Sequence, residues 1–150
     1  MPKPLSLVLE YDYDMKYIYC YILILCFFAC DSEPAPDCFQ LAGDTIQVPY
    51  ELPDFTKIRM EHNVSLVIKQ GETQEVILET GENLLPEVLV YVEDGVLVLR
   101  DNNNCNYVRD FGITRAIVTT PILTEIRNGS SYDVVGEGTL NFPSLHLISN

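Results

Sequence analysis

Basic residues are scarce in this sequence, and their scarcity excludes several kinds of partner. From Cys30 onward only seven Lys and Arg stand against 19 Asp and Glu, which gives this part of the chain a net charge of −12. Negative charge of that size repels nucleic acid phosphates and anionic lipid headgroups. The sequence also has no stripe of basic residues, so we expect no nucleic acid partner.

Sequence motifs for metal binding and for catalysis are also missing. His62 and His146 are isolated, and there is no C-x-x-C or H-x-x-x-H spacing, so a zinc centre is not expected. The serines considered as nucleophiles all lack the Gly-x-Ser-x-Gly context: Ser65, Ser130, Ser131 and Ser144. The carboxylates are scattered. We therefore predict a protein that is not an enzyme, with no catalytic residues, metal or cofactor.

Residues 17–29 (YIYCYILILCFFA) form an uncharged stretch that is too short for a membrane span. The stretch has 13 residues, whereas a spanning helix needs roughly 20. A core helix would show a polar face, and this stretch has none. Met15-Lys16 supplies the short positive start of a secretory signal. We therefore predict a signal peptide over residues 15–29.

The end of this stretch predicts attachment to lipid. Ala29-Cys30 resembles the lipobox of bacterial lipoproteins, in which a diacylglyceryl group is added to the cysteine sulfur and cleavage leaves that cysteine as the N-terminus. Phe27 stands where such boxes usually carry Leu or Val. The following DSEPAPD is polar and contains proline, which suits a tether. We interpret residues 30–43 as tether and N-terminal arm, with the membrane as a partner through lipid on Cys30.

Residues 1–14 (MPKPLSLVLEYDYD) fit poorly in front of a signal peptide. Glu10, Asp12 and Asp14 place negative charge where positive charge belongs. We interpret this stretch as an extension from a misplaced start codon, with Met15 as the true start.

The cysteines divide according to this export route. Cys20 and Cys26 would be removed with the signal peptide, and Cys30 would carry the lipid. Cys38 and Cys105 are then the two cysteines left in the domain. An even number of cysteines in an oxidising compartment predicts a Cys38–Cys105 disulfide. The alternative is two unpaired buried thiols.

From Asp44 onward the sequence alternates with period two, which predicts short β-strands and no helix. Lys69–Gln74 is expected to form a hairpin turn. Glu93-Asp-Gly95 is a stronger hairpin signal because Gly95 can adopt a positive φ. The expected strands cover residues 55–60, 64–69, 75–79, 88–92, 96–100, 113–119, 123–126, 132–135 and 145–148.

A loose repeat indicates how these strands stack. The stretches Pro53-Asp-Phe-Thr-Lys-Ile58, Pro121-Ile-Leu-Thr-Glu-Ile126 and Pro143-Ser-Leu-His-Leu-Ile148 share Pro-x-apolar-x-x-Ile. A repeat of about twenty residues with several short strands is typical of a β-solenoid. Phe55, Leu123 and Leu145 would then stack in the core, as would Ile58, Ile126 and Ile148. A twisted β-sandwich is the alternative.

The chain from Phe55 to its end resembles the putative auto-transporter adhesin, head-GIN domain family. The resemblance rests on the Phe-x-x-Ile opening, Gly81-Glu-Asn-Leu-Leu, Glu93-Asp-Gly and the Pro-x-Leu-x-x-Ile unit. It implies an all-β domain over residues 44–150 with the fold of a right-handed β-helix, in an envelope lipoprotein of a Gram-negative bacterium. Family members usually continue through further rungs, so a fragment, or a short member with an open last rung, is expected.

The sequence thus predicts an outer membrane-anchored lipoprotein, periplasmic or surface-exposed, with an adhesin-like binding domain for a surface glycan or a protein. The alternatives are a structural accessory that binds a protein through its open last rung, and a degenerate carbohydrate-active β-helix. Asn102–Asn106, with Tyr107, is the most distinctive polar stretch. Its side chains would either contact sugars or cap a turn beside the disulfide.

Overall fold

A computed structural model describes residues 17–18 and 37–149 of the chain. Tyr17 and Ile18 are helical and exposed. The expected lipidation site Cys30, most of the expected signal peptide and the extension 1–14 lie outside the described residues. Within the described residues, no helix is long and apolar enough to cross a membrane.

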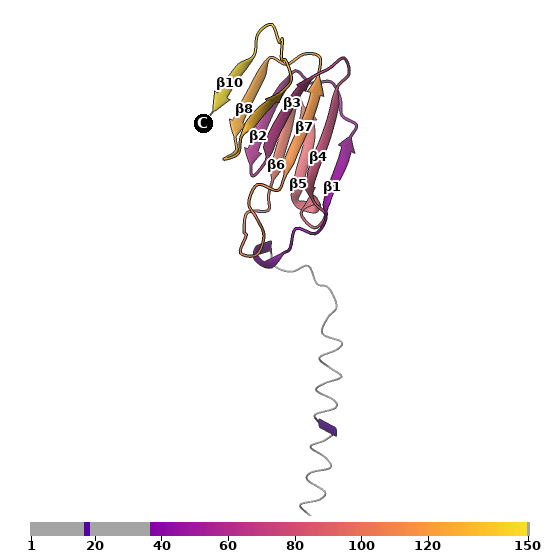
Figure 1. Ribbon diagram of the computed structural model, residues 1–150, viewed down its shortest axis with the longest axis vertical. Coiled ribbons are helices and arrows are strands. Elements are labelled where there is room, and N and C mark those ends of the chain that lie inside the picture. Colours follow the sequence, from indigo (N-terminus) through magenta and orange to yellow (C-terminus); the bar gives the residue numbers. More distant parts are fainter. Residues whose placement is uncertain (1–16, 19–36, 150) are drawn as a thin grey trace, which may run out of the picture. The chain divides into compact units, whose positions relative to one another are not determined.

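Residues 37–149 fold into two five-stranded sheets (Figure 1). One sheet has the order β1-β4-β7-β3-β9 and the other β10-β8-β2-β6-β5. The strands are β1 (Thr45–Tyr50), β2 (Lys57–His62), β3 (Ser65–Gln70), β4 (Glu75–Gly81), β5 (Val88–Glu93), β6 (Val96–Asp101), β7 (Arg115–Thr120), β8 (Glu125–Gly129), β9 (Val134–Glu137) and β10 (His146–Ser149). Two short 3-10 helices, η1 (Asp37–Phe39) and η2 (Leu85–Glu87), complete the described elements.

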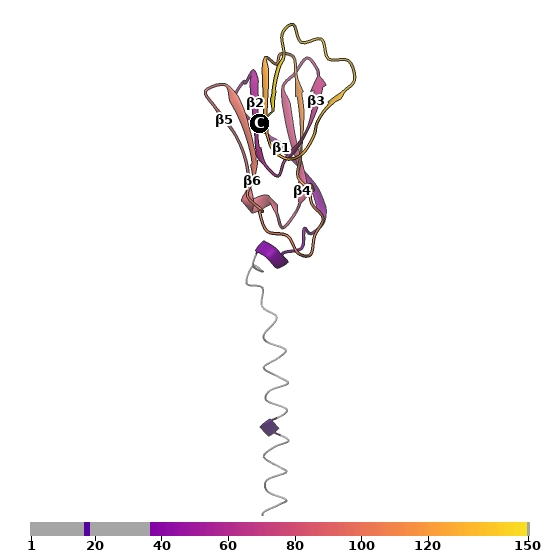
Figure 2. The same ribbon diagram turned by 90° about the vertical axis from the view of Figure 1, so that its left-hand side faces the viewer.

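The core lies between the two sheets, which form separate layers in Figure 2. Successive side chains of a strand point to opposite faces, so the alternating sequence presents one apolar row to the partner sheet. Ile58 and Met60 of β2 are buried in this way, and Leu66 and Ile68 of β3 meet them from the other sheet.

Two strands, one in each sheet, are paired in parallel on both sides. β2 lies between β6 and β8, and β3 lies between β7 and β9. The chain passes from β2 in one sheet to β3 in the other through Asn63 and Val64. His62 ends β2 with a φ of 60°, a backbone conformation that residues other than glycine adopt only occasionally.

One predicted turn is confirmed and the other is wrong. β5 and β6 pair as an antiparallel hairpin, and Asp94 and Gly95 both take positive φ, at 51° and 74°. Two such residues define the type I′ turn that suits the twist of a hairpin. The strands on either side of Lys69–Gln74 do not pair with each other, because β7 lies between β3 and β4.

The register of the repeat is confirmed for its first two copies and wrong for part of the third. Ile58 and Ile126 are paired neighbours, as predicted. The next strand places Leu147, not Ile148, beside Ile126. In the third copy, the two positions that face inward are one residue closer together than in the first two copies. Ile148 therefore pairs with Arg127 and points to the opposite face of the sheet.

The predicted all-β class is confirmed, and the strands form two mixed sheets, neither of which closes on itself. The antiparallel pairings of β1, β4 and β5 distinguish these two sheets from those of a coil in which all strands are parallel. The right-handed β-helix therefore stays a prediction. β1 was predicted only as part of the alternating region, and its Pro49 is tolerated because β1 lies at a sheet edge.

The register predicts a difference between two isoleucines of the repeat. Ile126→Ala should lower the free energy of unfolding by about 2–5 kcal/mol, because it leaves a cavity in the core. Ile148→Ala should cost less than about 1 kcal/mol, because that side chain lies on the opposite face. Urea unfolding of both variants measures the difference. Equal losses would mean that the register is wrong.

Candidate functional site

The Cys38–Cys105 disulfide ties the N-terminal arm to the long loop between β6 and β7. The two Cα atoms lie 4.4 Å apart and the S–S distance is 2.02 Å, so the predicted pairing is confirmed. The backbone N–H of Tyr107 donates to the carbonyl of Cys38 at 3.0 Å. Arg109 Nη1 donates to the carbonyl of Gln40, also at 3.0 Å. The arm and the loop therefore form one joined structure at this end of the sheets.

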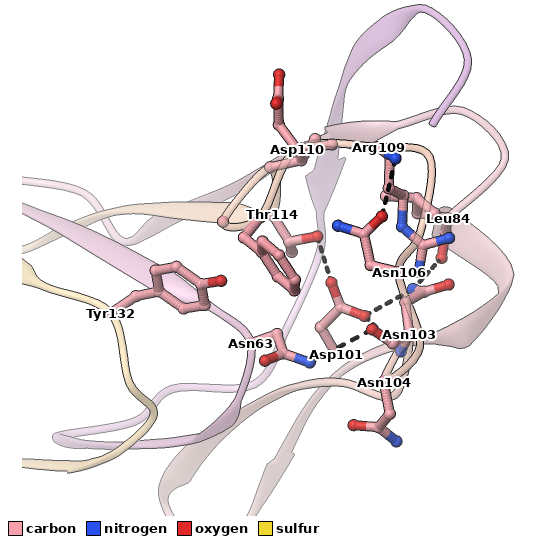
Figure 3. Close-up of a pocket in the computed structure, with 13 residues that line it drawn as sticks. Asn63, Leu84, Asp101, Asn103, Asn104, Asn106, Arg109, Asp110, Thr114 and Tyr132 are labelled. Atoms are coloured by element: carbon pink, nitrogen blue, oxygen red, sulfur yellow. Dashed lines mark hydrogen bonds between the residues drawn. The ribbon is translucent and has the colours of Figure 1, made fainter. Parts of the chain in front are cut away.

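A buried carboxylate organises the base of the same loop (Figure 3). Asp101 is the last residue of β6 and is only 3% exposed. Its Oδ1 accepts hydrogen bonds from the backbone N–H of Asn103 at 2.8 Å and from Asn103 Nδ2 at 2.6 Å. Its Oδ2 accepts from the hydroxyl of Thr114. Hydrogen bonds of this kind offset part of the cost of burying a charge.

Two buried threonines extend this network into the other sheet. Thr80 of β4 and Thr114 just before β7 have their hydroxyl oxygens 2.9 Å apart. Thr114 uses its single hydroxyl proton on Asp101, so Thr80 must be the donor in this pair. The chain Thr80–Thr114–Asp101 thus links β4 of one sheet to β6 of the other with every proton assigned.

One buried acceptor in the pocket lacks a partner. Asn103 Nδ2 also donates to the carbonyl of Leu84 at 3.0 Å, which leaves Asn103 Oδ1 buried without a hydrogen bond from any described residue. The adjoining cavity has a volume of about 40 Å³. Such a space accommodates a water molecule, which would donate to this oxygen. It is too small for a sugar ring or a peptide.

The Asn-rich stretch therefore caps the loop. Asn103 bridges Asp101 and Leu84, and Asn106 Oδ1 accepts from the backbone N–H of Arg109 at 2.8 Å. Of the two roles predicted for this stretch, the structure supports turn capping beside the disulfide for Asn103 and Asn106. Thr80 and Thr114 were not predicted as site residues. Their signal was a polar residue at an inward position of the alternating pattern, within β4 for Thr80 and directly before β7 for Thr114.

The candidate acid–base and nucleophilic residues are not brought together. His62 and His146 are both exposed and lie on different strands, β2 and β10. Glu61 forms ion pairs with Arg59 and Arg100. The Ser65 hydroxyl donates to the carbonyl of Thr114 at 3.2 Å. Across residues 17–18 and 37–149, no group of three or more His, Cys, Asp and Glu is placed to hold a metal ion.

A larger groove lies at the far end of the strands. Its volume is about 570 Å³, and it is lined by Pro49, Tyr50, Glu51, Leu52, Gln74, Glu75 and Val76. Tyr50 ends β1, whose first residue Thr45 pairs with Gly81 near the disulfide-linked end. Partial burial raises the pKa of the Tyr50 phenol above its usual 10.0. A phenol with the usual pKa is already neutral in the physiological pH range, so Tyr50 can donate a hydrogen bond there.

Comparison with known proteins identifies relatives of this fold. A family model described as "Putative auto-transporter adhesin, head GIN domain" matches residues 54–150. No curated protein matches the chain.

Three solved structures show similar folds. A putative adhesin from Parabacteroides merdae ATCC 43184 has a TM-score of 0.60 and 19% identity, covering 72% of this chain and 45% of that one. A putative adhesin from Bacteroides fragilis NCTC 9343 has a TM-score of 0.52 and 19% identity, covering 71% and 51%. A third, from Parabacteroides distasonis ATCC 8503, has a TM-score of 0.51 and 17% identity, covering 63% and 40%. The chain thus spans about half the length of these proteins or less.

The Asp101 network predicts a specific loss of stability. Asp101→Asn should lower the free energy of unfolding by about 2–3 kcal/mol, because three donors converge on the carboxylate and the amide nitrogen that replaces one oxygen cannot accept from the donors on its side. Asp110→Asn, in the same loop but exposed, is the matched control and should change it by less than about 0.5 kcal/mol. Urea unfolding measures both. Similar values would show that Asp101 does not organise the loop.

The disulfide predicts sensitivity to reductant. The double variant Cys38→Ala/Cys105→Ala should lose about 2–4 kcal/mol of unfolding free energy, because the unfolded chain is no longer cross-linked. Reductant should lower the midpoint of the natural sequence towards that of the double variant and leave the double variant unchanged. An unfolding midpoint that is insensitive to reductant in both proteins would contradict this.

Proposed function

Because the chain belongs to the family of putative auto-transporter adhesins with a head GIN domain, we propose that it is a lipoprotein of the cell envelope whose β domain binds a surface ligand. The observation that carries this proposal is the family match over residues 54–150, which covers nearly all of the two-sheet domain. The proposed role is binding without catalysis, since the candidate acid–base residues His62 and His146 are exposed and lie on different strands.

The export sequence supports attachment to the outer membrane. An uncharged stretch over residues 17–29 ends in Ala29-Cys30, followed by the polar sequence DSEPAPD. Diacylglycerol on the Cys30 sulfur and a third acyl chain on its amino group would hold the protein stably, whereas one chain gives only marginal binding. The confirmed Cys38–Cys105 disulfide is consistent with an oxidising compartment such as the periplasm or the cell surface.

The groove at the Tyr50 end is the proposed ligand site. Tyr50 and Leu52 offer apolar surface, and Glu51 and Glu75 offer carboxylates around it. The Gln74 side chain braces the lining, because it accepts from the Phe55 N–H and donates to the Pro53 carbonyl. Ligand sites commonly combine an aromatic or apolar lining with a few polar groups in this way. Its volume of about 570 Å³ suits a short glycan or a protein segment far better than the polar pocket beside Asp101 does.

We also propose that the parallel strands are rungs of a β-helical coil, right-handed as the family resemblance implies. β2, β8 and β10 stack in parallel in one sheet, and β3 and β9 do so in the other. The chain crosses between the sheets after β2 and again after β8. Each such pair of strands corresponds to one rung of a solenoid.

A structural accessory that binds a protein through the surface beside β10 is the second candidate. A groove of about 180 Å³ opens beside β10 and is lined by Ile126, Asn128, Val134, Leu147, Ile148 and Ser149. Leu147 is 69% exposed although it continues the buried row of Ile58 and Ile126. An apolar rung of this kind favours further β-pairing.

Mass spectrometry of the membrane fraction tests the anchor. The natural sequence should yield a mature protein that begins at Cys30 and carries a diacylglyceryl group, because cleavage follows lipid attachment. Cys30→Ala should lose both the lipid and the membrane association. Cys38→Ala is the matched control and should keep both, since Cys38 is committed to the disulfide. An unmodified N-terminus, or one at Met1, would overturn the lipoprotein assignment.

A further inference from the structure

Exposed apolar side chains gather at the disulfide-linked end of the domain. Five of the ten large hydrophobic residues exposed between positions 37 and 149 belong to the arm or to the loop between β6 and β7. These five, named here the loop-end patch, are Phe39, Leu41, Tyr107, Val108 and Phe111. Tyr107 and Phe111 are each 76% exposed, the highest values in the set. Single exposed hydrophobic residues are ordinary, but a cluster indicates an interaction surface.

The loop-end patch is held in place by the structure around it. The Phe39 and Tyr107 rings lie 5.8 Å apart, centroid to centroid. The disulfide and the hydrogen bond from the Tyr107 N–H to Cys38 fix the arm against the loop. The aromatic rings are thus presented by a cross-linked end of the protein.

The same end carries an open groove of about 590 Å³. Leu41, Tyr107, Val108 and Ile113 line its apolar part, and Arg109 and Asp110 supply one charge of each sign. The groove therefore combines apolar surface with balanced charge. This mixture suits the boundary between headgroups and acyl chains, where one side is wet and the other apolar.

The position of the patch in the chain identifies its partner. Only seven residues lie between Cys30 and Cys38, and Phe39 follows directly. Even fully extended, the eight residue-to-residue steps from Cys30 to Cys38 span at most about 28 Å. This step rests on the proposed lipid anchor at Cys30. With that anchor in a membrane, the loop-end patch is the part of the domain tethered nearest to the bilayer.

We propose that the loop-end patch docks on the surface of the membrane that holds the lipid anchor, with Tyr107 and Phe111 inserted at the level of the headgroups. The expected surface is zwitterionic, because a net charge of −12 from Cys30 onward opposes approach to anionic lipid. The patch would add a second, weak membrane contact to the lipid and so fix the orientation of the domain.

Tryptophan reporters can test this docking because the natural sequence contains no tryptophan. Tyr107→Trp and Phe111→Trp place single reporters in the patch. Ile122→Trp is the matched control, because Ile122 is 51% exposed and follows the far end of β7. The lipidated full-length variants are reconstituted in phosphatidylcholine vesicles with and without brominated acyl chains, and quenching of the emission is measured.

Docking predicts several-fold stronger quenching by brominated lipid in the two patch variants than in Ile122→Trp, together with weaker quenching by aqueous acrylamide. If the variants float with the vesicles but all three reporters respond alike, the docking proposal is wrong and the anchor stands. In that case the patch would be left for a protein partner. If mass spectrometry finds no lipid on Cys30 and the protein does not float with the vesicles, both the proposed lipid anchor and the docking proposal are wrong.

Discussion

The fold depends on the parallel pairing of β2 and β3 with neighbours on both sides. Parallel neighbours cannot be joined by a tight hairpin, so the chain must leave the sheet between them. Here it leaves by crossing to the opposite sheet, and Asn63 and Val64 are enough to carry it from β2 to β3. Because the crossing is so short, the two sheets are fixed against each other at this point. The apolar rows of β2 and β3 then face one shared core, in which Met60, Val64 and Leu66 are fully buried.

The crossing from β6 to β7 is much longer, and a polar network holds it where the apolar core ends. Asp101 closes β6 and receives donors from Asn103 and Thr114, and Thr80 links this network to β4. The disulfide then secures the tip of the loop to the N-terminal arm. A loop ordered in this way can hold aromatic side chains in water, because its conformation does not depend on burying them.

The sequence predicted well wherever a local signal agreed with the pairing of the strands. Asp94-Gly95 requires positive φ at two successive residues, and this turn chemistry is local. Lys69–Gln74 carries a similar turn signal, yet β7 inserts between its flanking strands, and insertion of a distant strand leaves no trace in six residues. The register predicted for the third repeat was wrong for a different reason. A one-residue difference in spacing moves Leu147 inward and Ile148 outward, so the side chains change faces while the motif still matches. In the candidate site the disulfide was predictable by counting cysteines. The threonine network was not, because it joins residues from three separate segments.

The two ends of the domain differ in ways that suit opposite tasks. At one end η1 lies beside the loop between β6 and β7 (Figure 1). This arm and this loop carry the exposed aromatic residues Phe39, Tyr107 and Phe111. At the other end, one strand length away, Tyr50, Gln74 and Glu75 line the groove proposed for the ligand. A strand of six residues measures about 20 Å. A domain resting on its loop end would therefore present the Tyr50 groove about 20 Å further from the lipid. Docking would then increase the affinity for the ligand. A domain that is already fixed in orientation loses less rotational entropy on binding than a freely rotating domain does.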